Sequence, residues 1–276
     1  MESDEQQQQL LEDAMNEATG VVQSEEEATN VTDPIQPNQE IQQQSNARFQ
    51  GASWYNKMQE QDICIAGLGG IGSWTALLIS RLNVNLLALY DNDKVSEINM
   101  SGQLFRHEYI GCSKVYACNQ NIYTFTDMRR IQAFPNRYTR SSNFYPITIC
   151  AFDNMEARKE AFYNWSNYIY KNKEIDASKC LFIDGRLSLE ELQIFCMSGT
   201  DREYWKKYDG DYLFDGAEAV QAPCSAKQTT YMASMIASLI ANLVVNFVDN
   251  QANNNFRSLP FYTEYKAATM NLKMEQ

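Results

Sequence analysis

The sequence lacks the residue clusters that build a zinc site. Its 276 residues include a single histidine, His107, and none of its seven cysteines belongs to a CxxC pair. Structural zinc sites are usually built from such pairs and from histidines, so we expect no structural zinc. We assign His107 no catalytic role, because no serine or cysteine motif lies near it. An odd number of cysteines without a secretory signal indicates a reducing, cytoplasmic compartment.

Positive charge is missing from the first 46 residues. They hold eleven acidic residues, ten glutamines and no lysine or arginine, whereas residues 47–276 hold 24 acidic and 23 basic residues. The net charge of −12 therefore belongs mostly to this first segment. A segment so poor in apolar side chains cannot offset the entropy of ordering it. We predict a disordered, acidic, Gln-rich tail over 1–46 and a folded domain over 47–276. Because the folded part is nearly neutral, we expect no nucleic acid partner.

Charge is also absent from residues 231–248, a run long enough to cross a membrane. Within it, Ser234, Ser238, Asn242 and Asn246 recur at every fourth position and form one polar stripe. No lysine or arginine closely flanks the run to anchor it at a membrane interface. We therefore predict a helix of the core or of a homodimer interface, and no membrane partner.

Apolar periodicity in the rest of the chain predicts strands that alternate with helices. Such alternation favours an α/β fold with a doubly wound, mainly parallel, Rossmann-like sheet and helices on both faces. After the mainly parallel part of the sheet, we expect a C-terminal crossover segment, the long helix and edge strands. The elements that we expect are strands at 62–67, 85–91, 130–135, 146–153, 180–185 and 192–198, helices at 70–83, 112–127, 154–170 and 231–248, and one or two edge strands within 259–274.

A glycine-rich turn follows the first of these strands. Gly67, Gly69 and Gly72 match the pattern G-x-G-x-x-G between a strand and a helix, where backbone N–H groups can approach a phosphate. Asp91 ends the second strand, 19 residues after Gly72, where a carboxylate can accept hydrogen bonds from ribose hydroxyls. Asp153 and Asp184 end two further strands, so we expect the carboxylates to gather at one edge of the sheet. These residues predict a nucleotide site but do not separate NAD from ATP.

The sequence resembles the ThiF/MoeB/ubiquitin-activating E1 family in five motifs that appear in order. They are GLGGIG (67–72), DNDKV (91–95), NMSGQ (99–103), IGCSKV (110–115) and AFDN (151–154). The resemblance is strong over roughly 48–155 and looser in the remainder. It implies an ATP- and Mg²⁺-dependent adenylyltransferase that activates the C-terminal carboxylate of a small protein or peptide, releases pyrophosphate and forms a homodimer.

The resemblance also implies roles for individual residues. The cradle for the nucleotide would be Gly67, Gly69, Gly70 and Gly72, and Asp91 would hold the ribose. Asp153 would bind Mg²⁺. The remaining nucleotide-binding positions are Asp93, Asn99, Gln103 and Lys114, of which Asn99 and Lys114 would contact phosphate. Without the resemblance, Lys114 reads as a solvated residue at a helix end and Asp153 as a helix N-cap.

The chain departs from the family pattern at Gly102, where relatives usually have an arginine that contacts the phosphates. Arg106, and Arg48 before the first strand, are the candidates to replace that arginine. Cys224 lies on the segment that crosses the active site in relatives, where a cysteine is a thioester nucleophile in some members and a zinc ligand in others. A structural role for Cys224 stays open beside the nucleophile.

Two other functions remain open at this point. The glycines and Asp91 alone would also suit an NAD-dependent oxidoreductase, although no catalytic His/Lys/Tyr arrangement is evident. The loss of arginine at position 102 would suit a non-catalytic scaffold that keeps the nucleotide-binding fold. Asp184 and Arg186 would either shape a substrate channel or form an ordinary ion pair at the end of a strand.

Overall fold

The computed structural model describes residues 48–214, 228–253 and 256–276, which all belong to one compact unit, Gln42–Gln276. The tail predicted over 1–46 lies outside the described residues, and so does Cys224.

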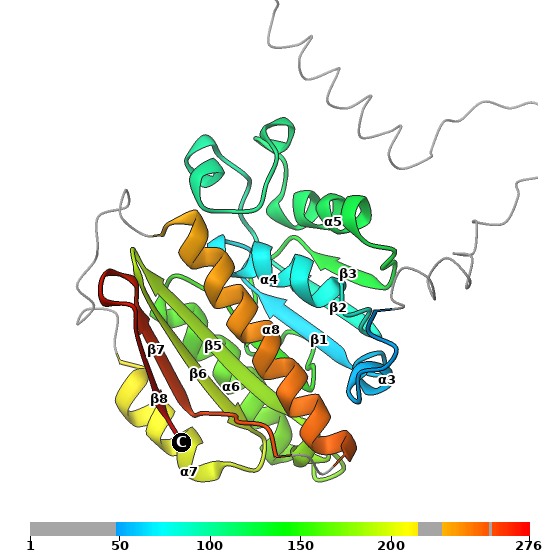
Figure 1. The fold of residues 1–276 in the computed structure, drawn as a ribbon, viewed down its shortest axis with the longest axis vertical. Coiled ribbons are helices and arrows are strands. Elements are labelled where there is room, and N and C mark those ends of the chain that lie inside the picture. Colours follow the sequence, from blue (N-terminus) through cyan, green and yellow to red (C-terminus); the bar gives the residue numbers. More distant parts are fainter. Residues whose placement is uncertain (1–47, 215–227, 254–255) are drawn as a thin grey trace, which may run out of the picture. The chain divides into compact units, whose positions relative to one another are not determined.

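An eight-stranded sheet in the order β3-β2-β1-β4-β5-β6-β7-β8 forms the centre of this unit (Figure 1). The first five strands along the chain are parallel and the last three pair antiparallel. This is the mainly parallel α/β sheet that the sequence predicted, with the expected edge strands at its C-terminal end. The strands are β1 (Asp62–Ala66), β2 (Leu86–Tyr90), β3 (Ile131–Phe134), β4 (Ile147–Cys150), β5 (Leu181–Ser188), β6 (Glu191–Ser198), β7 (Tyr262–Lys266) and β8 (Asn271–Glu275).

Helices cover both faces of the sheet, as predicted (Figure 1). One core cluster packs α4 and α8 against the sheet through Ile79 and Ile240, and the other packs α6 and α7 through Trp165 and Trp205. Strands covered on both faces are buried along nearly their whole length, which explains their continuous apolar runs. The helices are α3 (Tyr55–Met58), α4 (Gly70–Ser80), α5 (Lys114–Phe125), α6 (Met155–Lys171), α7 (Arg202–Lys207) and α8 (Thr230–Asn253), with short helical turns η1 (Glu97–Ser101), η2 (His107–Tyr109), η3 (Ala177–Lys179), η4 (Tyr208–Tyr212) and η7 (Ala267–Thr269).

The long apolar helix α8 packs along α4 and β5. In the part of the chain that the structure describes, it is the one helix long and apolar enough to cross a membrane, but 56% of its most apolar window is buried inside the fold. Ala233, Ala237 and Val244 are completely buried, whereas Ser238 and Asn242 of the polar stripe are exposed. The helix therefore contributes to the core, as predicted.

The expected end of the fifth strand was wrong. β5 does not stop near Asp184 but continues to Ser188, because β6 pairs with it antiparallel along all eight of its residues. A two-residue turn joins them, with Leu189 at a φ of +52°. Asp184 is therefore inside a strand, level with the last residue of β4.

Candidate functional site

The sheet reverses its strand order between β1 and β4, since β2 and β3 follow on one side and β5 on the other. Ligands of such sheets bind beyond the carboxyl ends of the strands at this point. The last residues of β1, β2 and β4 are in register, so the loops that follow them start side by side. These loops carry Gly67, Asp91 and Asp153, and the topology therefore brings the three positions to one edge.

Two glycines shape the turn after β1. Gly67 has a φ of +94°, and a Cβ there would lie 2.9 Å from the carbonyl oxygen of Ala151 in the loop after β4. A Cβ at Gly72 would lie 1.8 Å from the carbonyl oxygen of Gly67, so α4 can only begin this close to the turn with glycine at position 72.

At the N-terminus of α4, the described residues leave space around Gly69, while the side chain of Gln228 packs on Gly70. A Cβ added at Gly69 would meet only Nε2 of Gln103, at 4.0 Å. Gly69 is the N-cap residue, no described side chain caps the helix, and its first turn holds no acidic residue. The first N–H groups of a helix have no acceptor within the helix, and the helix dipole favours an anion there. The turn can therefore receive a phosphate group.

Asp91 stabilises this turn through hydrogen bonds to the backbone. Its Oδ2 accepts a hydrogen bond from the backbone N–H of Leu68 (2.7 Å) and its Oδ1 one from that of Asp93 (2.8 Å). Burial raises the pKa of Asp91, although the nearby ammonium of Lys114 opposes that rise. Each carboxylate oxygen keeps a second lone pair, so Asp91 can still accept a ribose hydroxyl.

Lys114 is the first residue of α5 and is buried, so the alternative of a solvated lysine was wrong. Its Nζ lies 2.9 Å from Oδ2 of Asp93, which is 62% exposed at the side chain. The backbone N–H of Lys114 also donates to the carbonyl oxygen of Asp93 (3.0 Å). This ion pair therefore holds the ammonium group of Lys114 beside the loop that carries Asp91 and Asp93.

Asp153 is not the N-cap of α6. The cap is Asn154, whose Oδ1 accepts the backbone N–H of Ala157 (2.9 Å), while Asp153 is exposed one residue earlier. Among the described residues, no three His, Cys, Asp or Glu side chains gather to hold a metal ion. Mg²⁺ commonly takes one or two carboxylates and completes its shell with phosphate oxygens and water. Asp153 fits such a shared site, and the described residues around it supply no all-protein site.

Measurements of protein stability can show whether Asp153 caps α6 or is available to bind a metal ion. Asn154→Ala is expected to lower the free energy of unfolding by about 1 kcal/mol, because the N-cap hydrogen bond is lost. Asp153→Ala should change it by less than about 0.5 kcal/mol. Urea denaturation of both variants measures the difference. Equal losses would mean that Asp153 contributes to the cap.

The polar loop after β2 places its predicted residues in different surroundings. Oδ1 of Asn99 accepts hydrogen bonds from the backbone N–H (2.9 Å) and the hydroxyl (3.0 Å) of Ser96, the N-cap of η1, so the two residues form a capping box. Oε1 of Gln103 is buried beside the glycine turn with no hydrogen-bond partner among residues 48–214, 228–253 and 256–276, so a ligand could satisfy it. Gln103 therefore fits the ligand site directly, and Asn99 shapes the loop.

The two candidate arginines lie in exposed positions. The guanidinium of Arg106 contacts the ring and hydroxyl of Tyr109 and lies 2.9 Å from Glu108, within its own loop. Arg48 is exposed at the first described residue. Within the part of the chain that the structure describes, neither arginine contacts the glycine turn.

Asp184 is the centre of a buried ion-pair cluster that we had only partly expected. Arg186 Nε (2.7 Å) and Arg158 Nε (3.2 Å) pair with its carboxylate, and the hydroxyl of Tyr208 donates to it (2.8 Å). Complete burial opposes ionisation, but the two arginines outweigh it and hold the pKa of Asp184 below its ordinary value. Nη2 of Arg158 also donates to the carbonyl oxygen of Phe152 (2.6 Å), next to Asp153.

Arg158 and Tyr208 were missed in the sequence. A signal was present, since Arg158 stands three residues after Met155 and four before Phe162, on the apolar face of α6. An arginine among core positions implies a buried partner. The cluster therefore supports the loop that carries Asp153, and Asp184 is not an open carboxylate of the site.

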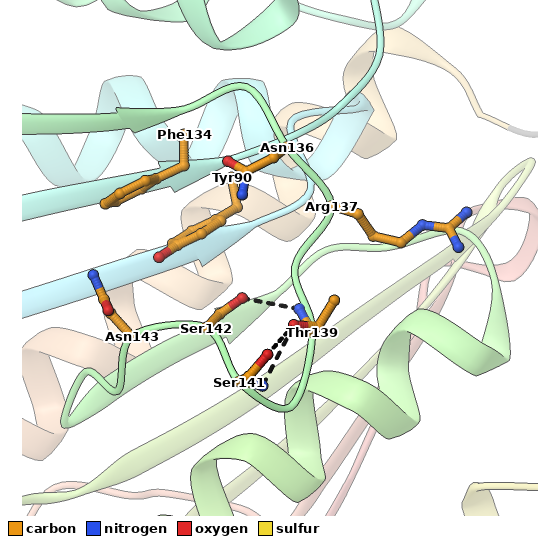
Figure 2. Close-up of a pocket in the computed structure, with 8 residues that line it drawn as sticks. All are labelled: Tyr90, Phe134, Asn136, Arg137, Thr139, Ser141, Ser142 and Asn143. Atoms are coloured by element: carbon orange, nitrogen blue, oxygen red, sulfur yellow. Dashed lines mark hydrogen bonds between the residues drawn. The ribbon is translucent and has the colours of Figure 1, made fainter.

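A polar hollow of about 260 Å³ lies where β2 and β3 end (Figure 2). The ring of Tyr90 stacks on that of Phe134, with 4.3 Å between their centroids, and the side chain of Arg137 points away from them. The backbone N–H of Asp91 donates to the carbonyl oxygen of Phe134 (3.3 Å), so the hollow adjoins the strand ends that carry the site. The described residues that line it include one cation and no carboxylate: Tyr90, Phe134, Asn136, Arg137, Thr139, Ser141, Ser142 and Asn143.

A model of the ThiF family matches residues 41–276. The sequence is 31% identical over 120 residues to ubiquitin-like modifier-activating enzyme 5 of Bombyx mori and 29% identical over 121 residues to that of Mus musculus. Each match covers 38% of this chain and 30% of the length of the relative.

Solved structures share the fold. PaaA matches with a TM-score of 0.64 and 16% identity over 100% of this chain and 83% of its own. E. coli MccB with ATP matches with a TM-score of 0.57 and 13% identity over 81% of this chain and 66% of its own. The family resemblance and the α/β fold expected from the sequence are thus confirmed.

Proposed function

The chain belongs to the ThiF family, and on this premise we propose that it adenylates the C-terminal carboxylate of a small protein or peptide, with ATP as the second substrate and Mg²⁺ as its counter-ion. The observation that carries the proposal is the N-terminus of α4, which no described side chain caps. Asp91 accepts the N–H of Leu68 in the turn before it, and Lys114 pairs with Asp93 in the same loop as Asp91. The names of its relatives agree, since one is an enzyme that activates a ubiquitin-like modifier and MccB was solved with ATP and with MccA.

In this reaction a carboxylate oxygen of the substrate attacks the α-phosphorus of ATP. The bond from that phosphorus to the bridging oxygen breaks, and pyrophosphate leaves with the electron pair. Asp91 orients the ribose, and the N–H groups of α4 and the ammonium of Lys114 stabilise negative charge on the phosphates. Mg²⁺ shared between the phosphates and Asp153 would screen their charge and improve the leaving group.

Three further features belong to the same proposal. The acyl group would pass to the thiolate of Cys224 and form a thioester, with release of AMP.

Two copies would associate through the exposed side of α8, whose Tyr231 and Met235 are exposed apolar side chains. The protein would act in the cytoplasm, in line with its free cysteines.

Calorimetric titration with Mg·ATP and with NAD⁺ tests the proposal, together with ATP–pyrophosphate exchange in the presence of candidate peptides. We expect Mg·ATP to bind and NAD⁺ to be ignored. Asp153→Ala should weaken Mg·ATP binding and reduce exchange by about 100-fold. Asp211→Ala, the same change at an exposed carboxylate of η4, should alter neither.

Other outcomes point to the alternatives. Binding of NAD⁺ alone would indicate an oxidoreductase. Binding of neither nucleotide would leave a scaffold that keeps the fold, which the glycine at position 102 would then explain.

A further inference from the structure

One side chain fills the space beside two glycines of the site. A Cβ at Gly70 would lie only 1.8 Å from Oε1 of Gln228, and a Cβ at Gly102 would lie 2.9 Å from its Cγ and 3.0 Å from its Nε2. Gln228 therefore packs directly on the first residue of α4 and on the residue between Asn99 and Gln103 where an arginine was expected.

Backbone conformation does not by itself require glycine at position 102. Its φ of −140° is accessible to residues with a side chain. A Cβ there would instead collide with the side chain of Gln228, which comes from a segment 126 positions later in the chain and would have to move. A side chain at 102 and the observed position of Gln228 are therefore mutually exclusive.

Several contacts hold the backbone of Gln228 and the residues around it in place. It forms a parallel bridge with Leu189 at the turn between β5 and β6. Two residues later, the hydroxyl of Thr230 at the start of α8 donates to the carbonyl oxygen of Ser101. From the opposite side, Nε1 of Trp74 donates to the carbonyl oxygen of Gly102 (3.2 Å). The beginning of α8 is thus attached to the loop and to α4 together.

We propose that Gln228 is a phosphate-binding residue of this site and takes the space that a side chain at position 102 would need. The inference rests on the proposed function, because it assigns Gln228 to the nucleotide's phosphates. Its carboxamide oxygen is the atom nearest to Gly70, at the positive end of the α4 dipole. Rotation of the terminal amide would present its NH₂ group to a phosphate oxygen instead, since the two ends have nearly the same size.

A carboxamide differs from a guanidinium in charge and in donor number. It offers two N–H donors and no positive charge, whereas arginine offers five donors and a full charge. We therefore expect ATP binding to depend on hydrogen bonds from Gln228 and to tolerate no negative charge at this position.

Titration calorimetry of position 228 variants with Mg·ATP tests the inference. Gln228→Glu keeps the shape but adds a negative charge beside the phosphates, and should raise the Kd by about tenfold or more. Gln228→Ala removes the hydrogen bonds and should raise it by about two- to tenfold. Gln251→Glu, the same change near the other end of α8, should leave the Kd unchanged. Melting temperatures without nucleotide show that each variant is folded.

A pair of variants tests the shared space. Gly102→Ala alone should weaken Mg·ATP binding, because its Cβ displaces Gln228, but it should have little further effect in a Gln228→Ala background. Additive effects, or Gln228→Glu with the wild-type Kd, would overturn the assignment of Gln228 while the proposed function stands. Failure of the wild-type protein to bind Mg·ATP would overturn both.

Discussion

Replacing Lys114 with methionine is expected to lower ATP–pyrophosphate exchange by about 10³-fold. Methionine keeps the length and apolar stem of lysine but removes the ammonium group. Removal of one preorganised group that stabilises transition-state charge typically costs about 10²–10³ in rate, and here the group also carries a full charge in a buried position. Asp91 would meanwhile lose the cation that opposes the rise of its pKa.

Two controls give this prediction a clear outcome. Lys94→Met makes the same change at an exposed lysine of the loop after β2 and should leave exchange within about twofold of wild type. Lys114→Arg keeps the charge but changes its geometry, so it should retain part of the activity. If Lys114→Met exchanges pyrophosphate normally while folded, Lys114 is only the structural partner of Asp93.

Replacing Arg158 with methionine is expected to lower the free energy of unfolding by about 3 kcal/mol. The change leaves the fully buried carboxylate of Asp184 with one arginine in place of two, and an incompletely paired buried charge is strongly destabilising. It also removes the hydrogen bond to the carbonyl oxygen of Phe152, which supports the loop of Asp153. Urea denaturation measures the loss of stability. The Kd of Mg·ATP, measured where the variant is fully folded, reports the effect on the loop of Asp153.

A matched control is available close by on the surface. Arg140 pairs with Glu160 of α6 at 2.7 Å, but its side chain is 55% exposed. Exposed pairs contribute little, so Arg140→Met should cost less than about 1 kcal/mol. Equal losses from Arg140→Met and Arg158→Met would contradict the importance of burial.

The effect of Arg158→Met should also depend on pH. The pKa of Asp184 is lowered in the folded protein, so its ion pairs contribute fully above the unfolded value, near 3.8. As the pH falls through the lower folded pKa, the carboxylate takes up a proton and the contribution is lost. The difference between wild type and Arg158→Met should therefore be constant from pH 5 to 7 and narrow in more acidic solution, which denaturation curves across that range would show.

Much of the site could be predicted because it is local in sequence. The strand, the glycine turn and α4 occupy consecutive residues, and the close approach of Gly67 and Gly72 follows from their spacing alone. Asp91 was found because parallel strands place their carboxyl ends at one edge. The sequence by itself thus determined the strand–turn–helix unit, the parallel sheet and the edge where the site lies.

Only the tertiary structure decided which side chains meet across that edge. Three of these contacts join segments that are distant along the chain. They are the pairing of Lys114 with Asp93, the pairing of Asp184 with Arg158, and the packing of Gln228 against Gly70 and Gly102. Periodicity reports whether one face of an element is apolar, but it does not report which polar group of another element reaches it. A side chain at 102 and the observed position of Gln228 exclude each other across segments 126 positions apart, so this exclusion appeared only in the folded chain.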